Sequence, residues 1–248
     1  MANVESNTSS SLTAIGEATA TCWSCGTMRA VHFCSSCGRV QPPRPVDYFM
    51  FFALPRKLNL DTALLEREFY ELSRKLHPDL CARADKREQE WSLEQSSLLN
   101  DAYRTLKDPI KRTEYLLRLE GVELEEQSKT ATEKARASGE IKKQVVPPDL
   151  LEEVFELNMQ LEELRAQKKL GEDDPALVEE IGRQKLELEQ KYESLSEELK
   201  KYWDDWDRLP DDSADENRSK VRHKMVDLLN RRSYIRNLVR DVSEVLEG

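Results

Sequence analysis

Hydrophobic residues recur at helical spacing through most of the chain beyond residue 46. Between Asp61 and Leu76, four apolar residues follow one another at intervals of four, three and four, which places them on one face of a helix. Asp61 is of a residue type that caps helix N-termini, so this helix is expected to begin there. A second stripe predicts a helix over about Trp91–Leu106, and Asp108-Pro109 ends it and starts a short third one. The three stripes are Leu65, Phe69, Leu72 and Leu76; Leu99, Ala102, Tyr103 and Leu106; and Ile110, Tyr115, Leu116 and Leu119.

The region after Pro147 shows the same pattern in three longer segments. Breaks near Gly171–Pro175 and Pro210–Ser213 separate these segments. Three amphipathic helices with short connections predict an antiparallel bundle. The apolar stripes are Leu150, Val154, Leu157, Leu161 and Leu164; Leu177, Ile181, Leu188, Tyr192, Leu195, Leu199, Tyr202 and Trp206; and Val221, Met225, Leu228, Ile235, Val239, Val242 and Leu246.

These segments suggest a division of the chain into five parts. Because strand-type alternation is scarce, the expected fold class is mainly α. Pro42, Pro43 and Pro45 are expected to form a stiff, extended linker. The expected parts are a disordered tail (1–21), a cysteine module (22–41), a helical hairpin region (46–121), a polar linker (122–146) and a three-helix bundle (147–248).

Composition and charge exclude some classes of partner. Charged residues make up 35% of the 248 residues, and the formal net charge is −10. Sequence-independent binding to nucleic acid needs lysine and arginine to neutralise phosphates, so this balance argues against it. No apolar run approaches membrane-spanning length. Residues 1–21 contain Glu5 and Glu17 but no Lys or Arg, unlike an organelle transit peptide. We therefore expect a cytoplasmic protein with neither nucleic acid nor membrane as a partner.

Four of the five cysteines lie in two short motifs, Cys22-Trp-Ser-Cys25-Gly and Cys34-Ser-Ser-Cys37-Gly. Each motif can form a tight knuckle whose two thiolates converge on one metal ion. Four thiolates complete the tetrahedral shell that structural zinc prefers, and they leave no open position for a catalytic water. We therefore predict a structural zinc site at these four cysteines. Redox-active motifs or an iron site are the alternatives, and Cys81 is assigned no role.

The tripeptide His77-Pro78-Asp79 follows the first predicted helix. Pro78 cannot continue that helix and biases His77 towards an extended conformation. The two polar side chains are therefore expected at an exposed corner between two antiparallel helices. Arg67 and Arg74 lie on the helix face opposite the apolar stripe. The alternative is a helix-ending proline beside a structural histidine.

The helical hairpin region resembles a J-domain in the order and spacing of its motifs. The resemblance implies a co-chaperone that is not itself an enzyme. His77, Pro78 and Asp79 would trigger ATP hydrolysis by a seventy-kilodalton heat-shock-type chaperone, and the helix with Arg67 and Arg74 would dock electrostatically. Leu80 stands where the family usually has a lysine, which favours a dedicated partner chaperone, and three glutamates dilute the basic helix. The matching residues are Asp47-Tyr48-Phe49, Leu76–Asp79, Asn100–Pro109, Arg112 and Tyr115, and the diluting glutamates are Glu66, Glu68 and Glu71.

A J-domain followed by a three-helix bundle is similar to the HscB family, co-chaperones of iron–sulfur cluster biogenesis, some of which carry a cysteine module. Leu116–Gly121, Phe155–Asn158 and Tyr234–Leu238 contribute to the resemblance. It implies an HscA-like or DnaK-like partner chaperone and an IscU-like cluster scaffold, which the bundle would hold on its outward face.

The residues of the first bundle helix give independent support for such a face. Leu151, Phe155 and Met159 fall outside its apolar stripe, and apolar residues on an outward face suggest a docking patch. Tyr234 likewise falls off the stripe of the last helix. The alternative is that these residues pack against the J-domain or the linker. By position, the resemblance implies scaffold contacts at Leu151, Phe155, Glu156, Met159, Glu163 and Tyr234.

Two other functions are open at this point. A zinc-ribbon nucleic-acid-binding protein would need a basic, aromatic face near the cysteines, where only Arg29, His32 and Arg39 are available. A general J-protein for unfolded clients would carry a Gly/Phe-rich linker and a β-rich client domain, and neither pattern is visible. An enzyme is not expected, because no catalytic pair, phosphate loop or open metal site stands out.

Overall fold

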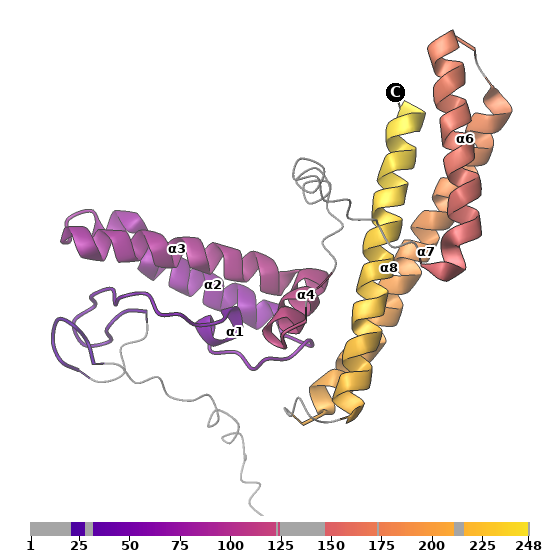
Figure 1. Cartoon of the computed structure of the whole chain (residues 1–248). Helices are drawn as coiled ribbons and strands as arrows, with labels where there is room; N and C mark the ends of the chain where they lie inside the picture. The colour runs from indigo at the N-terminus through magenta and orange to yellow at the C-terminus, as the bar shows by residue number, and fades with distance from the viewer. Residues whose placement is uncertain are drawn as a thin grey trace, which may run out of the picture. The chain divides into compact units, whose positions relative to one another are not determined.

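The computed structural model describes residues 21–27, 32–122, 124, 147–172, 174–210 and 216–247. The chain divides into two compact units, Met1–Leu116 and Leu117–Gly248 (Figure 1). Every element that the described residues form is a helix, which confirms the mainly α fold class. The predicted disordered tail and the predicted polar linker lie, apart from a few residues at their edges, outside the described residues.

No helix in the described part of the chain has both the length and the apolarity to span a bilayer. The cytoplasmic location and the bounds of the five predicted parts stay predictions.

The first unit contains a hairpin of two long helices, α2 (Thr62–Leu76) and α3 (Lys86–Lys107), which lie side by side (Figure 1). The Asp61 carboxylate accepts hydrogen bonds from two backbone N–H groups of α2, at 3.0 Å each, so this helix begins where the sequence predicts. Helix α3 begins five residues before the predicted Trp91. Asp85 caps it by accepting a hydrogen bond from the Glu88 N–H at 2.9 Å. The hydrophobic periodicity does not predict this start, because the first turn of the helix is polar.

The hairpin core is formed by α2, α3 and the short helices α1 (Tyr48–Phe51) and α4 (Pro109–Leu119). Phe69 of α2 stacks on Tyr103 of α3, with ring centroids 4.0 Å apart. Arg112 of α4 is buried and donates hydrogen bonds to the carbonyls of Leu58 and Leu106, at 2.9 and 2.5 Å. A buried guanidinium is tolerated here because backbone oxygens occupy its donors. Fully buried hairpin residues include Phe49, Leu58, Leu65, Leu76, Leu99, Ala102 and Leu106.

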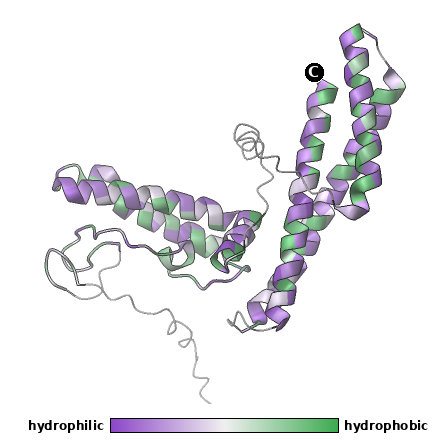
Figure 2. Ribbon diagram, in the orientation of Figure 1, coloured by the Kyte–Doolittle hydropathy of each residue, from purple (hydrophilic) through white to green (hydrophobic). Residues whose placement is uncertain are grey.

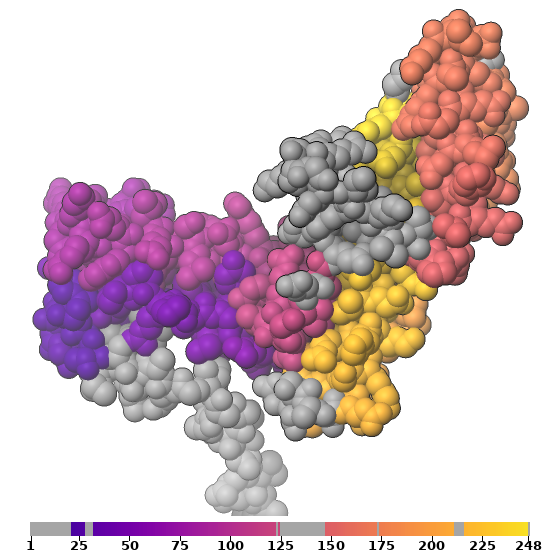
Figure 3. All heavy atoms as spheres, in the orientation of Figure 1, coloured from indigo at the N-terminus to yellow at the C-terminus, as the bar shows by residue number. Residues whose placement is uncertain are grey.

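The cysteine module packs directly against the hairpin, as the space-filling view shows (Figure 3). The His32 ring nitrogens lie 2.9 Å from the Gln95 side-chain oxygen and 2.9 Å from the Phe51 carbonyl. Gln95 also donates a hydrogen bond to the Gln41 carbonyl at 2.7 Å. Residues 42–45 therefore do not hold the module apart from the hairpin, because Gln95 of α3 anchors the chain at Gln41, directly before the prolines.

The second unit contains the predicted bundle of α6 (Leu151–Leu170), α7 (Pro175–Arg208) and α8 (Glu216–Glu247). Lys191 of α7 pairs with Glu153 near the start of α6, whereas Gln184 pairs with Gln160 further along it, so these two helices are antiparallel. Figure 2 shows hydrophobic and hydrophilic residues alternating around each helix. The bundle core contains Leu150, Val154, Leu157, Leu161, Leu164, Ile181, Leu188, Tyr234, Ile235, Leu238, Val242 and Val245.

Candidate functional site

The His-Pro-Asp corner lies directly after α2. His77 has φ −63° and ψ 129°, the extended conformation expected before Pro78, and the short 3-10 helix η1 (Pro78–Cys81) follows. The side chains of His77 and Asp79 are 56% and 91% exposed. The His77 Nδ1 atom accepts a hydrogen bond from the Asp79 N–H at 3.3 Å and lies 3.5 Å from the Asp79 carboxylate. The predicted exposed corner is confirmed, and its two polar side chains face solvent together.

Helix α3 fixes this corner from beneath. The hydroxyls of Ser92 and Ser96 both donate hydrogen bonds to the Leu76 carbonyl, each at 2.7 Å. The Gln89 amide donates to the carbonyls of Ala82 and Ala84, at 3.3 and 3.0 Å. Nothing in the sequence pattern distinguishes these α3 side chains, because serine and glutamine within a helix usually lie on its solvated face.

The outer face of α2 leads up to the corner. Arg67 and Arg74 are exposed, as predicted, and Tyr70 lies between them on the same face with 53% of its surface accessible. Glu68 is only 3.8 Å from the Arg67 guanidinium, so it offsets part of the positive charge. This face combines two cations with the exposed aromatic ring of Tyr70, a residue that the helical periodicity alone does not distinguish.

The four cysteines of the module converge on one point. Their sulfur atoms all lie within 4.8 Å of one another. The Cys22–Cys37 and Cys25–Cys34 sulfur pairs are 3.7 and 3.6 Å apart. A tetrahedral site with metal–sulfur bonds of about 2.3 Å needs sulfurs about 3.8 Å apart, so the cluster fits a tetrahedral metal ion.

The knuckle backbone supports this arrangement. The N–H groups of Ser24 and Ser36 point at the sulfurs of Cys22 and Cys34, at 3.4 Å each. The glycine that ends each motif has a positive φ, +74° at Gly26 and +72° at Gly38, which few other residues adopt without strain. Both motifs therefore have the conformation that directs two sulfurs at one ion.

The thiols also influence one another's protonation. Burial raises the pKa of Cys22, but hydrogen bonds from the backbone at Cys25 and Ser24, together with neighbouring thiols, outweigh it and lower that pKa to about 6. A backbone hydrogen bond at Arg39 lowers the pKa of Cys37, whereas burial and the other thiols outweigh it and raise that pKa to about 11. Four thiolates this close repel one another, so they can all be ionised together only around a cation.

The outer face of α6 carries the predicted apolar patch. Leu151, Phe155 and Met159 are 58%, 66% and 60% exposed, and Glu156 and Glu163 are exposed as well. Solvent exposure of these five residues is confirmed. We use "α6 patch" for Leu151, Phe155 and Met159 together.

Tyr234 does not belong to this patch. It is only 5% exposed and lies in the bundle core together with Leu238. The expectation that Tyr234 faces solvent is wrong, because α8 packs against both α6 and α7 and therefore buries a wider arc than a single stripe. Burial also raises the pKa of its phenol.

Comparisons with known proteins agree with this architecture. No family model matches the chain. An iron–sulfur cluster co-chaperone protein HscB homolog of Arabidopsis thaliana is 32% identical over 183 residues, which are 69% of this chain and 67% of the relative. HscB of Mus musculus is 39% identical over 111 residues, 42% of this chain and 47% of the relative. An HscB homolog of Vibrio cholerae is 42% identical over 85 residues, 34% of this chain and 50% of the relative. The mouse and bacterial matches thus span about half of those relatives.

Solved structures share the fold. The crystal structure of human co-chaperone protein HscB covers 91% of this chain and 98% of its own, with a TM-score of 0.60 and 24% identity. Chaperone HscB from Vibrio cholerae covers 82% of this chain and 98% of its own, with a TM-score of 0.52 and 25% identity. A helical hairpin with an exposed His-Pro-Asp corner, followed by a helical bundle, defines a J-domain co-chaperone. Within that class, the chain belongs to the HscB family.

Proposed function

We propose that this protein is a co-chaperone of iron–sulfur cluster assembly. It stimulates the ATPase of a dedicated seventy-kilodalton heat-shock-type chaperone, HscA-like or DnaK-like, and delivers an IscU-like scaffold protein to it. The observation that carries the proposal is the exposed His77-Pro78-Asp79 corner, held by α3, in a chain whose relatives are named iron–sulfur cluster co-chaperones.

The corner acts by docking rather than by chemistry of its own. Pro78 fixes the backbone between two exposed polar side chains, so little conformational entropy is lost when the partner binds. Arg67 and Arg74 supply positive charge on the outer face of α2, next to the corner. This charge speeds association with an acidic surface of the partner, and salt should slow that association. Nearby glutamates reduce this charge, which disfavours partners that offer only a generic acidic patch.

The cysteine cluster is proposed to hold one structural zinc ion. Its sulfur spacing fits a tetrahedral site, and four thiolates satisfy the preference of zinc for sulfur ligands. When bound, the ion supplies folding energy to a module that has few apolar residues of its own. The nucleic-acid-binding alternative loses support, because Gln95 and Phe51 engage His32, and Glu88 engages Arg39.

The α6 patch is proposed to bind the scaffold protein, with Glu156 and Glu163 at its rim. An exposed aromatic ring between two aliphatic side chains has the composition of a binding hot spot. Rim carboxylates suit a partner with basic residues around its apolar contact. Tyr234 is not included, since its side chain is buried in the free protein.

A histidine substitution at the corner tests the function. His77→Gln should abolish stimulation of the partner ATPase, because the exposed imidazole is a docking group. The free energy of unfolding should change by less than about 0.5 kcal/mol, as is usual at exposed positions. His223→Gln, the same change at an exposed position of α8, serves as the matched control and should stimulate normally. Steady-state ATPase assays and denaturant melts give the result, and full stimulation by His77→Gln would refute the assignment.

A further inference from the structure

The first turns of α3 support two different structures at once. Gln89, Ser92 and Ser96 hold the segment that bears the His-Pro-Asp corner. Glu88 and Gln95, on the neighbouring face of the same turns, hold the cysteine module. The corner and the metal site are therefore joined through residues 88–96 of α3, about two and a half helical turns.

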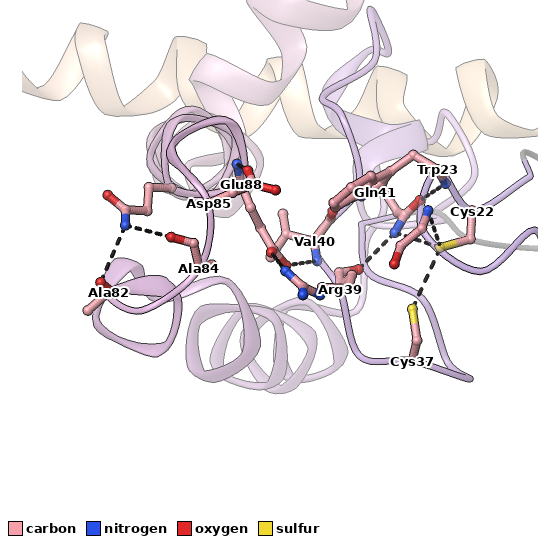
Figure 4. A network of polar contacts seen from close by, with 12 residues as sticks. Cys22, Trp23, Cys37, Arg39, Val40, Gln41, Ala82, Ala84, Asp85 and Glu88 are labelled. Carbon is pink, nitrogen blue, oxygen red and sulfur yellow. Dashed lines mark hydrogen bonds and ion pairs between the residues drawn. The ribbon is translucent and has the colours of Figure 1, made fainter.

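Glu88 is the central residue of this junction (Figure 4). Its buried carboxylate accepts hydrogen bonds from the Val40 N–H at 2.9 Å and from the Arg39 guanidinium at 2.5 Å. Its backbone N–H donates to the Asp85 side chain at 2.9 Å, the bond that caps α3 directly after the corner segment. Loss of the module would leave this buried carboxylate without either of those donors.

The metal ligands fix the residues that reach Glu88. The Gln41 side-chain amide donates to the Cys22 sulfur at 3.5 Å and to the Arg39 carbonyl at 2.8 Å. The Cys34 N–H donates to the same carbonyl at 2.8 Å. The backbone of Arg39 is thus bonded to one ligand residue directly and to another through Gln41.

Aromatic packing reinforces the same contact. The Trp23 ring packs edge-on against Trp91 of α3, with centroids 5.6 Å apart, and its indole N–H donates to the Val40 carbonyl at 2.8 Å. The Arg87 guanidinium of α3 lies 5.6 Å from the Trp23 ring centroid. Trp23 stands within the first cysteine motif, so the knuckle and α3 meet without an intervening spacer.

We propose that the cysteine module, when its thiolates hold a metal ion, positions the His-Pro-Asp corner for docking. Without the metal ion, the module would no longer offer hydrogen-bond partners to two buried polar side chains, Glu88 and Gln95. Buried polar groups without hydrogen bonds destabilise the structure around them. The start of α3 would then fray, and Gln89 and Ser92 would lose their hold on the corner segment. Glu88 and Gln95 are thus positioning residues for the corner.

Two variants of the full-length chain test this inference. Glu88→Gln keeps all four cysteines but removes the charge that Arg39 needs, and Glu90→Gln is its exposed control on the same helix. Cys37→Ser removes a metal ligand, and Ser35→Ala is its exposed control in the same knuckle. Elemental analysis should show that only Cys37→Ser loses the metal.

The first readout is amide hydrogen exchange at residues 79–84, where four N–H groups are bonded within the corner segment. Exchange there should speed up in both variants, more in Cys37→Ser, and by a larger factor than at amides of α2, while amides of the bundle stay protected. This measurement requires no partner protein.

The second readout rests on the proposed function. In titrations of the partner ATPase, Glu88→Gln should raise the half-maximal concentration about five-fold, because only a fraction of its corners is competent to dock. The maximal stimulation by Glu88→Gln should be retained. His77→Gln, in contrast, should abolish the stimulation, because His77 itself contacts the partner.

If residues 79–84 of both variants exchange their amide hydrogens at the same rate as in the wild-type protein, the inference is wrong. A rise of the same size at the corner and over all of α2 and α3 in both variants would overturn it too, since the module would then stabilise the hairpin evenly and not the corner in particular. If the wild-type protein stimulates no ATPase while exchange responds as expected, the proposed function fails and the positioning role stands.

Discussion

At the scale of single residues, Phe155 and Tyr234 show what the sequence pattern can and cannot decide. Both are aromatic, and both fall outside the apolar stripe of their helix. Phe155 is 66% exposed as predicted, whereas Tyr234 is 5% exposed. Periodicity places a residue on a face of its helix, but only the packing of neighbouring helices decides how wide an arc is covered. Glu88 shows the same limit, since nothing in its sequence context distinguishes it from a solvated helix residue.

These two aromatic residues should respond differently to truncation. Tyr234→Ala should lower the free energy of unfolding of the bundle by about 3 kcal/mol, because it leaves a cavity in the core. Phe155→Ala should change it by less than about 1 kcal/mol, because the ring already faces solvent. Denaturant melts followed by circular dichroism compare the two. Equal losses would contradict the assignment of one residue to the core and the other to the surface.

At the scale of elements, the sequence predicted the helices better than their ends or their contacts. Asp61 marked the start of α2 correctly, because a capping aspartate and an apolar stripe coincide there. The start of α3 was missed, because its first turn is polar and Asp85 alone caps it. Pro42, Pro43 and Pro45 predict a stiff, extended linker, but the sequence does not reveal that side-chain hydrogen bonds from α3 hold the module against the hairpin. Such long-range polar contacts leave no periodic trace in the sequence.

The outer face of α6 gives the prediction at this scale. Truncating Leu151, Phe155 and Met159 together to Ala should weaken binding of an IscU-type scaffold by several kcal/mol, since single anchors often contribute about 2 kcal/mol. Val178→Ala with Leu186→Ala, two exposed apolar positions of α7, is the matched control and should bind normally. Titration calorimetry with the purified scaffold measures both proteins. Unchanged affinity of the triple variant would remove the α6 patch from the scaffold-binding surface.

At the scale of the whole molecule, metal removal should affect the two units unequally. The purified protein should contain one zinc ion per chain, and a thiol-reactive mercurial followed by a chelator should release it. The described hydrogen bonds from the module to other segments end on residues of the first unit, such as Phe51, Glu88 and Gln95. The bundle in the second unit has its own core, centred on residues such as Leu161 and Ile181.

Release of the metal should therefore lower the unfolding midpoint of the first unit by roughly 10 °C, the shift expected for a loss of about 2 kcal/mol in a unit of this size. The bundle should keep its midpoint. Temperature-dependent hydrogen exchange follows α3 and α7 separately within the intact chain. As a control for effects at Cys81, the same mercurial treatment is applied to a protein with all four cluster cysteines replaced by Ser. Purified protein without metal would contradict the zinc assignment. An equal loss of protection in α3 and α7 would mean that the module stabilises the chain as a whole, and not the hairpin on which it packs.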